Sequence, residues 1–338
     1  MDGGYIQEQS LQFHKGVIMA IELSIVNGNT IYYPCVKDEI TWETERKGAP
    51  GVLKFTVVKT PDVYFEEGNA VRLVVDGKKV FFGFVFKKKR DREQHIDVTA
   101  YDQLRYFKNK ETYVYKDKTA SQVISMIAKD FRMNVGSLAN TGYVIPKKVE
   151  DDKTLFDIAQ SAMDETLMKT KKLYVLYDDF GKLTLKNIES MKCNVVIDAE
   201  TGENFSYESS IDERTYNQIK IVFDNEETGK REVYISKDSR NINKWGVLQY
   251  YEKASQGEGL ARKVDALLGL YNMQTRRLKI EKAKGVLGVR AGSSVIVMLN
   301  LGDVTVQTYM VCEKVKHTFS NDYHTMDLTV VGNKTFVA

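Results

Sequence analysis

Four histidines are the first candidates for chemistry, and their spacing argues against a catalytic or metal site. They are His14, His95, His317 and His324. None forms the His-x-x-x-His pair that holds zinc on a helix. His95 and His324 each stand just before a predicted strand, which favours a structural or surface role over acid–base catalysis. We therefore expect no metal site.

The cysteines and the paired carboxylates also argue against a catalytic or metal site. Three cysteines, Cys35, Cys193 and Cys312, are odd in number and lack metal-ligand spacing, which is typical of idle thiols in a chain made in a reducing compartment. The acidic pairs are Asp151-Asp152 and Asp178-Asp179. Glycoside hydrolysis needs two carboxylates about 5–10 Å apart across a cleft, and adjacent residues do not supply this geometry. Asp178-Asp179 also lies where a hairpin turn is predicted, and turns favour Asp. No dinucleotide, Walker-type or Gly-x-Ser-x-Gly motif is present, so we expect no catalytic residues and no cofactor.

One dense basic run is the remaining candidate site. Its basic residues are Lys87, Lys88, Lys89, Arg90 and Arg92. Three interpretations stay open: a solvated loop between strands, a patch that faces a partner or a lumen, and a nucleic-acid contact. Aromatic residues precede the run at Phe81, Phe82, Phe84 and Phe86, but they fall on both faces of the predicted strand. This pattern suits a strand buried on both sides better than a stacking platform for single strands.

Bulk properties exclude several classes of protein. The chain has 338 residues, a net charge of +3, 43% hydrophobic and 28% charged residues. This length predicts two or three domains, the composition is that of an ordinary globular protein, and the small charge does not mark a nucleic-acid binder. No stretch approaches the roughly 18 apolar residues of a membrane span. Residues 1–18 lack the apolar core of a signal peptide, and we expect them to be an N-terminal extension.

The secondary-structure pattern predicts a mainly β protein with an α+β insert. Residues 19–108 show short strands without helical periodicity, typical of a closed or nearly closed β unit. Its clearest part is a meander: Val71–Val75, the turn Asp76-Gly77, Val80–Phe86, a charged loop Lys87–Gln94, and Ile96–Tyr101. Residues 109–204 contain two capped helices, starting after Thr119 and Thr154, and a hairpin at 173–186. Residues 205–338 are again mainly β, with one helix from about Ser255 to Tyr271.

The two β regions resemble each other. Gly68-Asn69-Ala70-Val71 matches Gly292-Ser293-Ser294-Val295, Asp76-Gly77 matches Leu301-Gly302, and the strand around Asp97 matches the strand around Asp327. The second copy needs about six extra residues, which we expect in a loop at Glu313–Tyr323. Two unrelated β meanders can look this similar, and that alternative stays open. Otherwise the chain carries two related tube-like β domains, of barrel or sandwich type, on either side of the insert.

Several stretches resemble one specific family. They are Trp42–Gly48, Phe82–Phe86, Val98–Tyr106, Thr119–Ser121 and Leu173–Gly181. From about Met19 to the C-terminus the chain is similar to tail hub proteins of contractile phage tails and tail-like particles of Gram-positive hosts. Within these it resembles the XkdQ/YqbQ family of PBSX-type defective prophages.

The resemblance implies a non-enzymatic baseplate hub that acts through its shape. A homotrimer would present six similar β domains as a pseudo-sixfold ring, joining the hexameric tail tube to a central spike or tip. Implied partners are the tail tube protein, the spike or tip protein, other baseplate proteins and a peptidoglycan-binding tail protein, with no membrane contact and no sequence-specific nucleic-acid binding. The protein would be made in the bacterial cytoplasm and assembled into a virion tail or a bacteriocin-like particle. Alternatives are a tail-associated cell-wall hydrolase, or a binding module for nucleic acid or wall polymer.

Overall fold

The computed structural model describes residues 19–198, 200–212, 214–226, 228–254, 259–300 and 305–332. The first β unit contains β1 (Ile21–Asn27), β2 (Thr30–Tyr32), β3 (Val36–Glu45), β4 (Val52–Val58), β5 (Ala70–Val75), β6 (Lys78–Arg90) and β7 (His95–Tyr101). Buried and less buried residues alternate along β4, β5 and β7, as expected for strands with one face on a core. The expected meander is present, because β5 pairs with β6 and β6 pairs with β7.

The charged loop predicted at Lys87–Gln94 is wrong for its first half. Lys87 to Arg90 continue β6 and pair with β7, and only residues 91–94 form the turn. The polar side chains suggested a loop, but strand pairing uses backbone groups and does not need apolar side chains.

The α+β insert folds around its own core. Its elements are η1 (Gln103–Lys108), β8 (Lys110–Thr119), α1 (Ala120–Asp130), β9 (Val135–Leu138), β10 (Val144–Thr154), α2 (Leu155–Thr170), β11 (Tyr174–Asp178), β12 (Leu183–Asn187) and η2 (Ile188–Met191). Both predicted helix starts are confirmed: Thr119 forms a complete capping box with Gln122, and Thr154 accepts a hydrogen bond from the Asp157 amide. The apolar faces of α1 and α2 meet in this core, where Ile124 and Ile158 are fully buried.

The second β unit is discontinuous in sequence. It contains β13 (Lys192–Ile197), β14 (Asn204–Ser210), β18 (Thr275–Lys284), β19 (Ser294–Asn300), β20 (Thr305–Phe319) and β21 (His324–Gly332). β13 falls inside the range 109–204 expected for the insert, yet it pairs with β19. Lys192–Ile197 therefore belong to the same sheet as the second β unit.

A smaller unit projects between β14 and β18. It contains β15 (Gln218–Asn225), β16 (Lys230–Lys237), α3 (Ser239–Trp245), β17 (Gln249–Ala254) and α4 (Leu260–Tyr271). The predicted hairpin is β15–β16, and α4 packs its apolar side on Ile219 and Ile221. Residues 255–258, where the predicted helix was to begin, lie outside the described residues. No helix among the described residues is long and apolar enough to cross a membrane.

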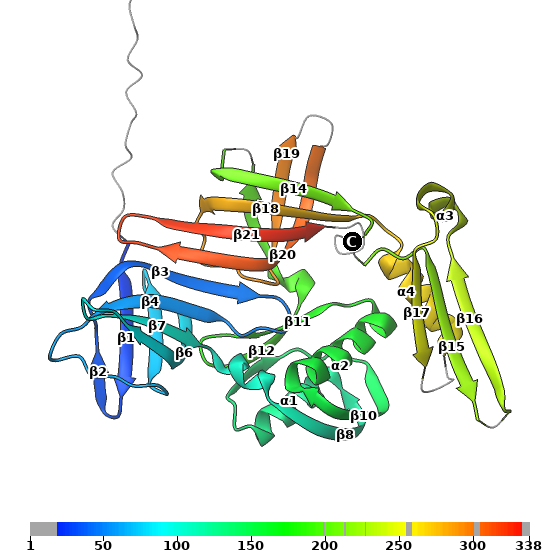
Figure 1. Cartoon of the computed structure of the whole chain (residues 1–338), viewed down its shortest axis with the longest axis horizontal. Coiled ribbons are helices and arrows are strands. Elements are labelled where there is room, and N and C mark those ends of the chain that lie inside the picture. The colour runs from blue at the N-terminus through cyan, green and yellow to red at the C-terminus, as the bar shows by residue number, and fades with distance from the viewer. Residues whose placement is uncertain are drawn as a thin grey trace, which may run out of the picture.

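One sheet joins the two β units. Its strands follow the order β14-β18-β21-β20-β3-β4-β7-β6-β5-β1-β2, and β13 joins through β19, which pairs with β20. The link is β20 against β3, so the C-terminal strands lie beside the N-terminal strands, with the insert on one side of both (Figure 1). This confirms a mainly β fold with an α+β insert.

The two units repeat one arrangement strand by strand. The order β3-β4-β7-β6-β5-β1 matches β14-β18-β21-β20-β19-β13, although β1 is antiparallel to β5 and β13 is parallel to β19. The registers also match: Thr99 pairs with Lys54 in one unit, and Thr329 pairs with Lys279 in the other.

Backbone details repeat as well, which two unrelated meanders would not share. Gly68 and Gly292 both have φ +91°, a conformation that favours glycine. The Gly68 amide donates to the Val85 carbonyl and the Gly292 amide to the Cys312 carbonyl, each at 2.8 Å. A β-bulge follows directly in both copies, between Val85 and Lys87 and between Cys312 and Lys314.

The extra residues of the second copy are placed differently from the prediction. Ala70 pairs with Phe84 and Ser294 with Val311, which leaves three extra residues (311 − 294 = 17 against 84 − 70 = 14) in the first hairpin. Phe84 pairs with Tyr101 and Val311 with Val331, which leaves three more (20 against 17) in the second hairpin. Glu313–Tyr323 is therefore not a long loop, because β20 runs to Phe319. Leu301-Gly302, the predicted match of Asp76-Gly77, lies outside the described residues.

Candidate functional site

The two β units are joined where β20 pairs with β3, and side chains contact one another on both faces of this pairing. Lys314 pairs with Glu45 in register, Lys316 with Glu43, and His317 with Trp42. On one face of the sheet, Lys314 Nζ lies 2.8 Å from Glu43 and 3.2 Å from Glu45. Cross-strand pairs of opposite charge stabilise such a ladder.

Aromatic rings cover the other face of this link. The His317 ring stacks on Trp42 with centroids 5.2 Å apart, and it is fully buried. Its Nδ1 lies 2.8 Å from His324 Nε2, and its Nε2 lies 2.8 Å from the Val289 carbonyl. Burial lowers the pKa of both histidines to about 4, so both rings are neutral near pH 7. His324 therefore has a structural role, which the sequence had favoured.

A buried polar cluster joins the two β units to the insert. Arg290 of the second unit places its guanidinium carbon 3.9 Å from the ring centroid of Tyr177, and its Nη1 donates to the Asp178 carbonyl at 3.1 Å. Asp178 of the insert accepts hydrogen bonds from Gln103 Nε2 at 2.8 Å and from the Gly181 amide at 2.6 Å. Burial raises the pKa of the Asp178 carboxyl above its usual value.

Asp102 adds the first β unit to this cluster. Its carboxylate accepts from the Gly51 amide at 2.8 Å and from the Leu104 amide at 3.0 Å. Burial, and then the nearby Asp178, raise the pKa of Asp102 well above its usual value. Both carboxyls are more than 90% buried, so they fix the units to one another and do not face a substrate.

The sequence missed most of this cluster. The cap formed by Asp102 had a local signal, because Asp is favoured before a helical turn. Arg290 had none, because its partners are 112 and more residues away in the chain. The other carboxylate pair, Asp151 and Asp152, is exposed on β10, where Asp152 pairs with Lys110 at 3.1 Å.

The predicted basic residues lie along the end of β6 and in the turn that follows. Lys87, Lys89, Arg90 and Arg92 are exposed. Lys88 is partly buried, because its Nζ donates to the Phe65 carbonyl at 2.8 Å and lies 3.4 Å from Glu67. Lys87 and Lys89 therefore face one side of the strand, while Lys88 and Arg90 face the other.

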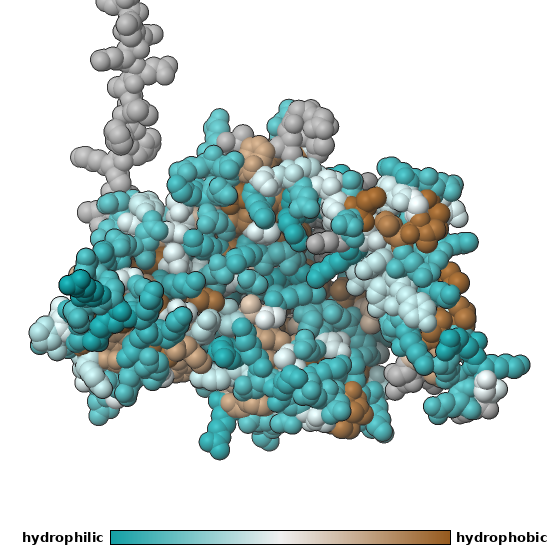
Figure 2. Space-filling model, viewed as in Figure 1, coloured by the Kyte–Doolittle hydropathy of each residue, from teal (hydrophilic) through white to brown (hydrophobic). Residues whose placement is uncertain are grey.

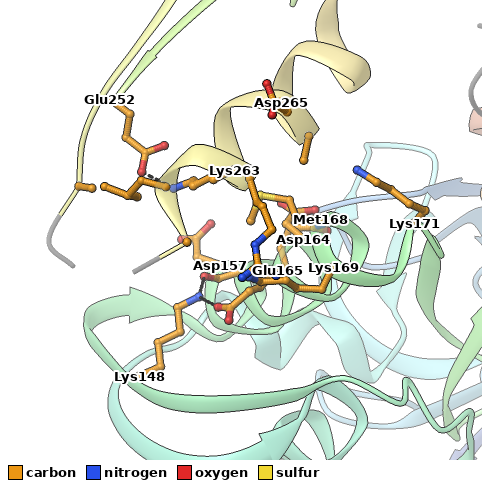
Figure 3. Close-up of a pocket in the computed structure, with 17 residues that line it drawn as sticks. Lys148, Asp157, Asp164, Glu165, Met168, Lys169, Lys171, Glu252, Lys263 and Asp265 are labelled. Atoms are coloured by element: carbon orange, nitrogen blue, oxygen red, sulfur yellow. Dashed lines mark hydrogen bonds and ion pairs between the residues drawn. The ribbon is translucent and has the colours of Figure 1, made fainter. Parts of the chain in front are cut away.

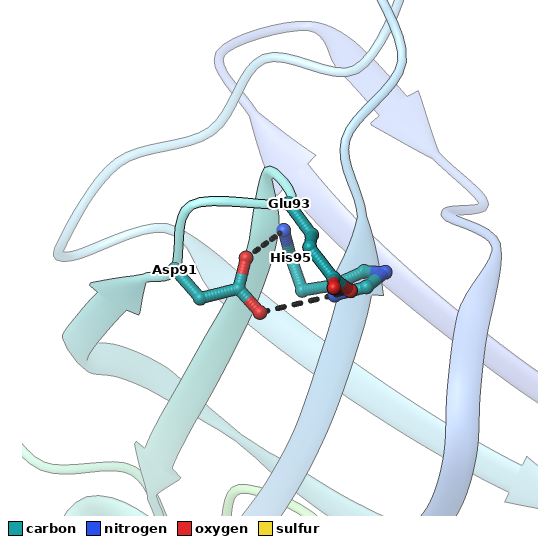
Figure 4. Close-up of side chains that lie close together, drawn as sticks. All are labelled: Asp91, Glu93 and His95. Carbon is teal, nitrogen blue, oxygen red and sulfur yellow. Dashed lines mark hydrogen bonds and ion pairs between the residues drawn. The ribbon is translucent and has the colours of Figure 1, made fainter.

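The turn after β6 brings Asp91, Glu93 and His95 together, with their ligand-type atoms within 4.8 Å of one another (Figure 4). The contacts are those of the turn itself, since Asp91 accepts from the His95 amide at 2.8 Å and lies 3.0 Å from its Nδ1. Asp91 and Glu93 are exposed, His95 is partly buried, and each acidic group contacts the same imidazole. The cluster therefore explains how the turn is held.

A cleft of about 1010 Å³ separates α2 from α4 and β17 (Figure 3). Its walls carry cations and carboxylates in similar number, and each of two ion pairs lies within one wall. Lys148 lies 3.0 Å from Glu165, and Lys263 lies 2.5 Å from Glu252. These two pairs hold side chains of the insert and of the small unit in place, and the cleft presents charges of both signs.

Apolar surface gathers on the small unit of β15, β16 and β17. Val233, Ile235 and Tyr251 are each about half exposed. Their strands, β16 and β17, lie on either side of β15, and Figure 2 shows hydrophobic surface over this unit. An exposed apolar patch of this kind marks a contact surface more often than a catalytic one.

Comparisons with known proteins identify the family of this chain. The model of the YQBQ-like family matches residues 40–331. The phage-like element PBSX protein XkdQ of Bacillus subtilis (strain 168) is 32% identical over 327 residues, covering 93% of this chain and 98% of the relative.

Two solved structures share the fold at low sequence identity. The 43 kDa tail protein of prophage MuSo2 from Shewanella oneidensis has a TM-score of 0.69 and 13% identity, covering 93% of this chain and 99% of its own. The c3393 protein of E. coli, described as a type VI secretion component with structural similarity to the T4 bacteriophage tail proteins gp27 and gp5, has a TM-score of 0.55 and 10% identity, covering 94% and 78%. With the family match spanning most of the chain, this protein belongs to the YQBQ-like family.

Proposed function

We propose that this chain is a structural hub protein in the tail or baseplate of a phage or phage-tail-like particle. The observation that carries the proposal is the repeated β unit, joined to its own copy by the β20–β3 pairing. Support comes from the named relatives, which are a phage-like element protein, a prophage tail protein and a type VI secretion component.

Three copies of the chain would place six similar β units around one axis. Such a ring matches a six-fold tube on one side and a three-fold spike or tip on the other. Closed cyclic assemblies are the usual outcome when a protein binds its own copies. The buried cluster of Asp102, Asp178 and Arg290 supports this role, because it holds the units of each chain in a fixed arrangement.

In this proposal the protein acts through shape and contacts rather than catalysis. The buried carboxyls and histidines have structural partners, and the charged cleft contains ion pairs such as Lys148 with Glu165. The apolar face of β15 to β17 is available for another baseplate component.

Stoichiometry in assembled particles tests the proposal. Mass measurement of purified tail tips should give three copies of the chain for every six subunits in one ring of the tube. One copy per particle would overturn the trimeric hub. Reproducible clearing of peptidoglycan by the purified chain would instead support the alternative of a wall hydrolase.

A further inference from the structure

Each of the two strands in the internal β20–β3 link has a counterpart in the other β unit. These two counterpart strands do not pair with each other within the chain. By register, β20 corresponds to β6 and β3 corresponds to β14. Lys314 matches Lys87, Lys316 matches Lys89 and His317 matches Arg90. Glu43 matches Glu208 and Trp42 matches Tyr207, because they pair with Val52 and Leu53 in β4 and with Arg277 and Leu278 in β18.

Both counterpart edges are open among the described residues. β6 pairs with β5 only as far as Phe84, so Lys87 to Arg90 have a strand on the β7 side alone. β14 pairs with β18 and is the first strand of the sheet, with no partner on its other side. In Figure 1 β14 lies beside β18, at one edge of the layer formed by β14, β18, β21 and β20. Open strand edges readily pair with another chain.

Aromatic side chains on β14 are more exposed than the side chains at the matching positions of β3. Phe205 is 42% exposed, whereas Ile40, at the matching position of β3, is 4% exposed beside β20. Tyr207 is partly buried, whereas its counterpart Trp42 is 5% exposed. A strand laid along β14 as β20 lies along β3 would cover both aromatic side chains.

We propose that β6 of one subunit pairs with β14 of a second copy of this chain, in the register of the β20–β3 link. Lys87 then lies opposite Ser210, Lys88 opposite Ser209, Lys89 opposite Glu208 and Arg90 opposite Tyr207. Each chain uses its internal link once and this external link once, so the sheet continues from subunit to subunit.

Charge and ring contacts fit this occupant on both faces. Lys314 contacts Glu43 and Glu45 at the internal link, and Lys87 is placed to contact Glu208 in the same way. Arg277 of β18 pairs with Glu208 in register, so this carboxylate lies beside cations of both subunits. On the other face, Arg90 takes the place of His317 and stacks on Tyr207, a favourable arrangement for a guanidinium and an aromatic ring.

This inference rests on the proposed ring and adds the residues that close it. It also gives the basic run a specific role. Lysines at an open edge can instead serve to prevent pairing with other chains. The experiment must separate these two roles, and it must also separate failure of the register from failure of the ring.

A cross-linking pair can make both distinctions. In a Cys35→Ser, Cys193→Ser background, Lys87→Cys combined with Ser210→Cys places two thiols directly opposite each other. Cα atoms at such positions are about 4.5–5.5 Å apart, within the range of a disulfide. After mild oxidation of assembled tail tips, denaturing electrophoresis without reductant should show most of the chain as a covalent trimer of the 38.6 kDa subunit.

The matched control is Lys87→Cys with Ser209→Cys. A shift of one residue turns the second thiol to the opposite face of the sheet, so this pair should give at least about ten-fold less cross-linked product. Mass under reducing conditions confirms that both variants assemble. A trimeric mass with no cross-link at Ser210, or with equal cross-linking at Ser209 and Ser210, overturns the β6–β14 register while leaving the ring intact. A monomeric mass in particles contradicts the ring itself.

Discussion

Replacing Arg290 with methionine tests the buried cluster that holds the three parts of the chain together. The change removes the hydrogen bond to Asp178 and the stacking on Tyr177, and keeps much of the side-chain volume. It leaves the carboxyls of Asp102 and Asp178 buried without their cation. Removing one partner of a buried pair costs about 3–5 kcal/mol. Because Arg290 is only partly buried, we expect the lower end, about 3 kcal/mol, or roughly a 150-fold shift in the folding equilibrium.

The loss of stability caused by Arg290→Met should be larger at high pH than at low pH. Burial has already raised the pKa of both carboxyls, and Arg290 opposes that rise. Without Arg290 these pKa values rise further, so the folded state binds protons more readily than the unfolded state. Stability of the variant therefore falls as pH increases through the raised pKa values, and the loss is larger at pH 8 than at pH 5.

Urea unfolding of the isolated chain measures this effect. The guanidinium carbon of Arg290 lies 5.7 Å from the centroid of the Trp42 ring. In a Trp245→Phe background, the fluorescence of Trp42 therefore reports on the cluster. Arg276→Met, at an exposed position on β18, is the matched control and should change stability by less than about 0.5 kcal/mol. Adding Asp178→Asn to Arg290→Met should recover part of the loss. A change below about 1 kcal/mol at both pH values, or an equal loss at pH 5 and pH 8, would refute this account.

Two further predictions concern single positions. In the folded state His317 and His324 have pKa values of about 4, below the ordinary 6.5, so the stability they contribute is full above pH 6.5 and falls as pH drops towards 4. His317→Phe should therefore reduce the loss of stability at acid pH, measured as denaturation midpoints across this pH range. A variant with the same pH dependence as the original chain would contradict this prediction. Gly83→Ala should lower the thermal midpoint sharply, because a Cβ there would lie 2.2 Å from the Tyr101 carbonyl, whereas Gly288→Ala, with open space around it, should not; equal midpoints would show that β6 and β7 do not approach as described.

Local signals in the sequence were sufficient to predict most of the helices, strands and turns. Asp76-Gly77 marked a hairpin, and Thr119 with Gln122 marked a helix start, because turns and caps depend on neighbouring residues. The repeat was visible because Gly68 and Gly292 share a backbone conformation that few other residues adopt.

The candidate site depended on contacts that no local pattern encodes. The pairing of β20 with β3 joins residues about 270 positions apart, such as Lys314 and Glu45. Lys87 to Arg90 looked like a loop because their side chains are polar, although an open strand edge also selects such side chains. Their interpretation changed only when the register placed them at the positions of Lys314 to His317.

We propose that copies of this chain close a ring by repeating the contact that joins its own two β units. A cryo-EM map of the assembled tail tip that resolves individual strands tests it most directly. The map should show three chains around one axis, with the end of β6 in each chain alongside β14 of its neighbour. A ring in which β14 remains an open edge, or a tip that contains a single copy of the chain, would contradict it.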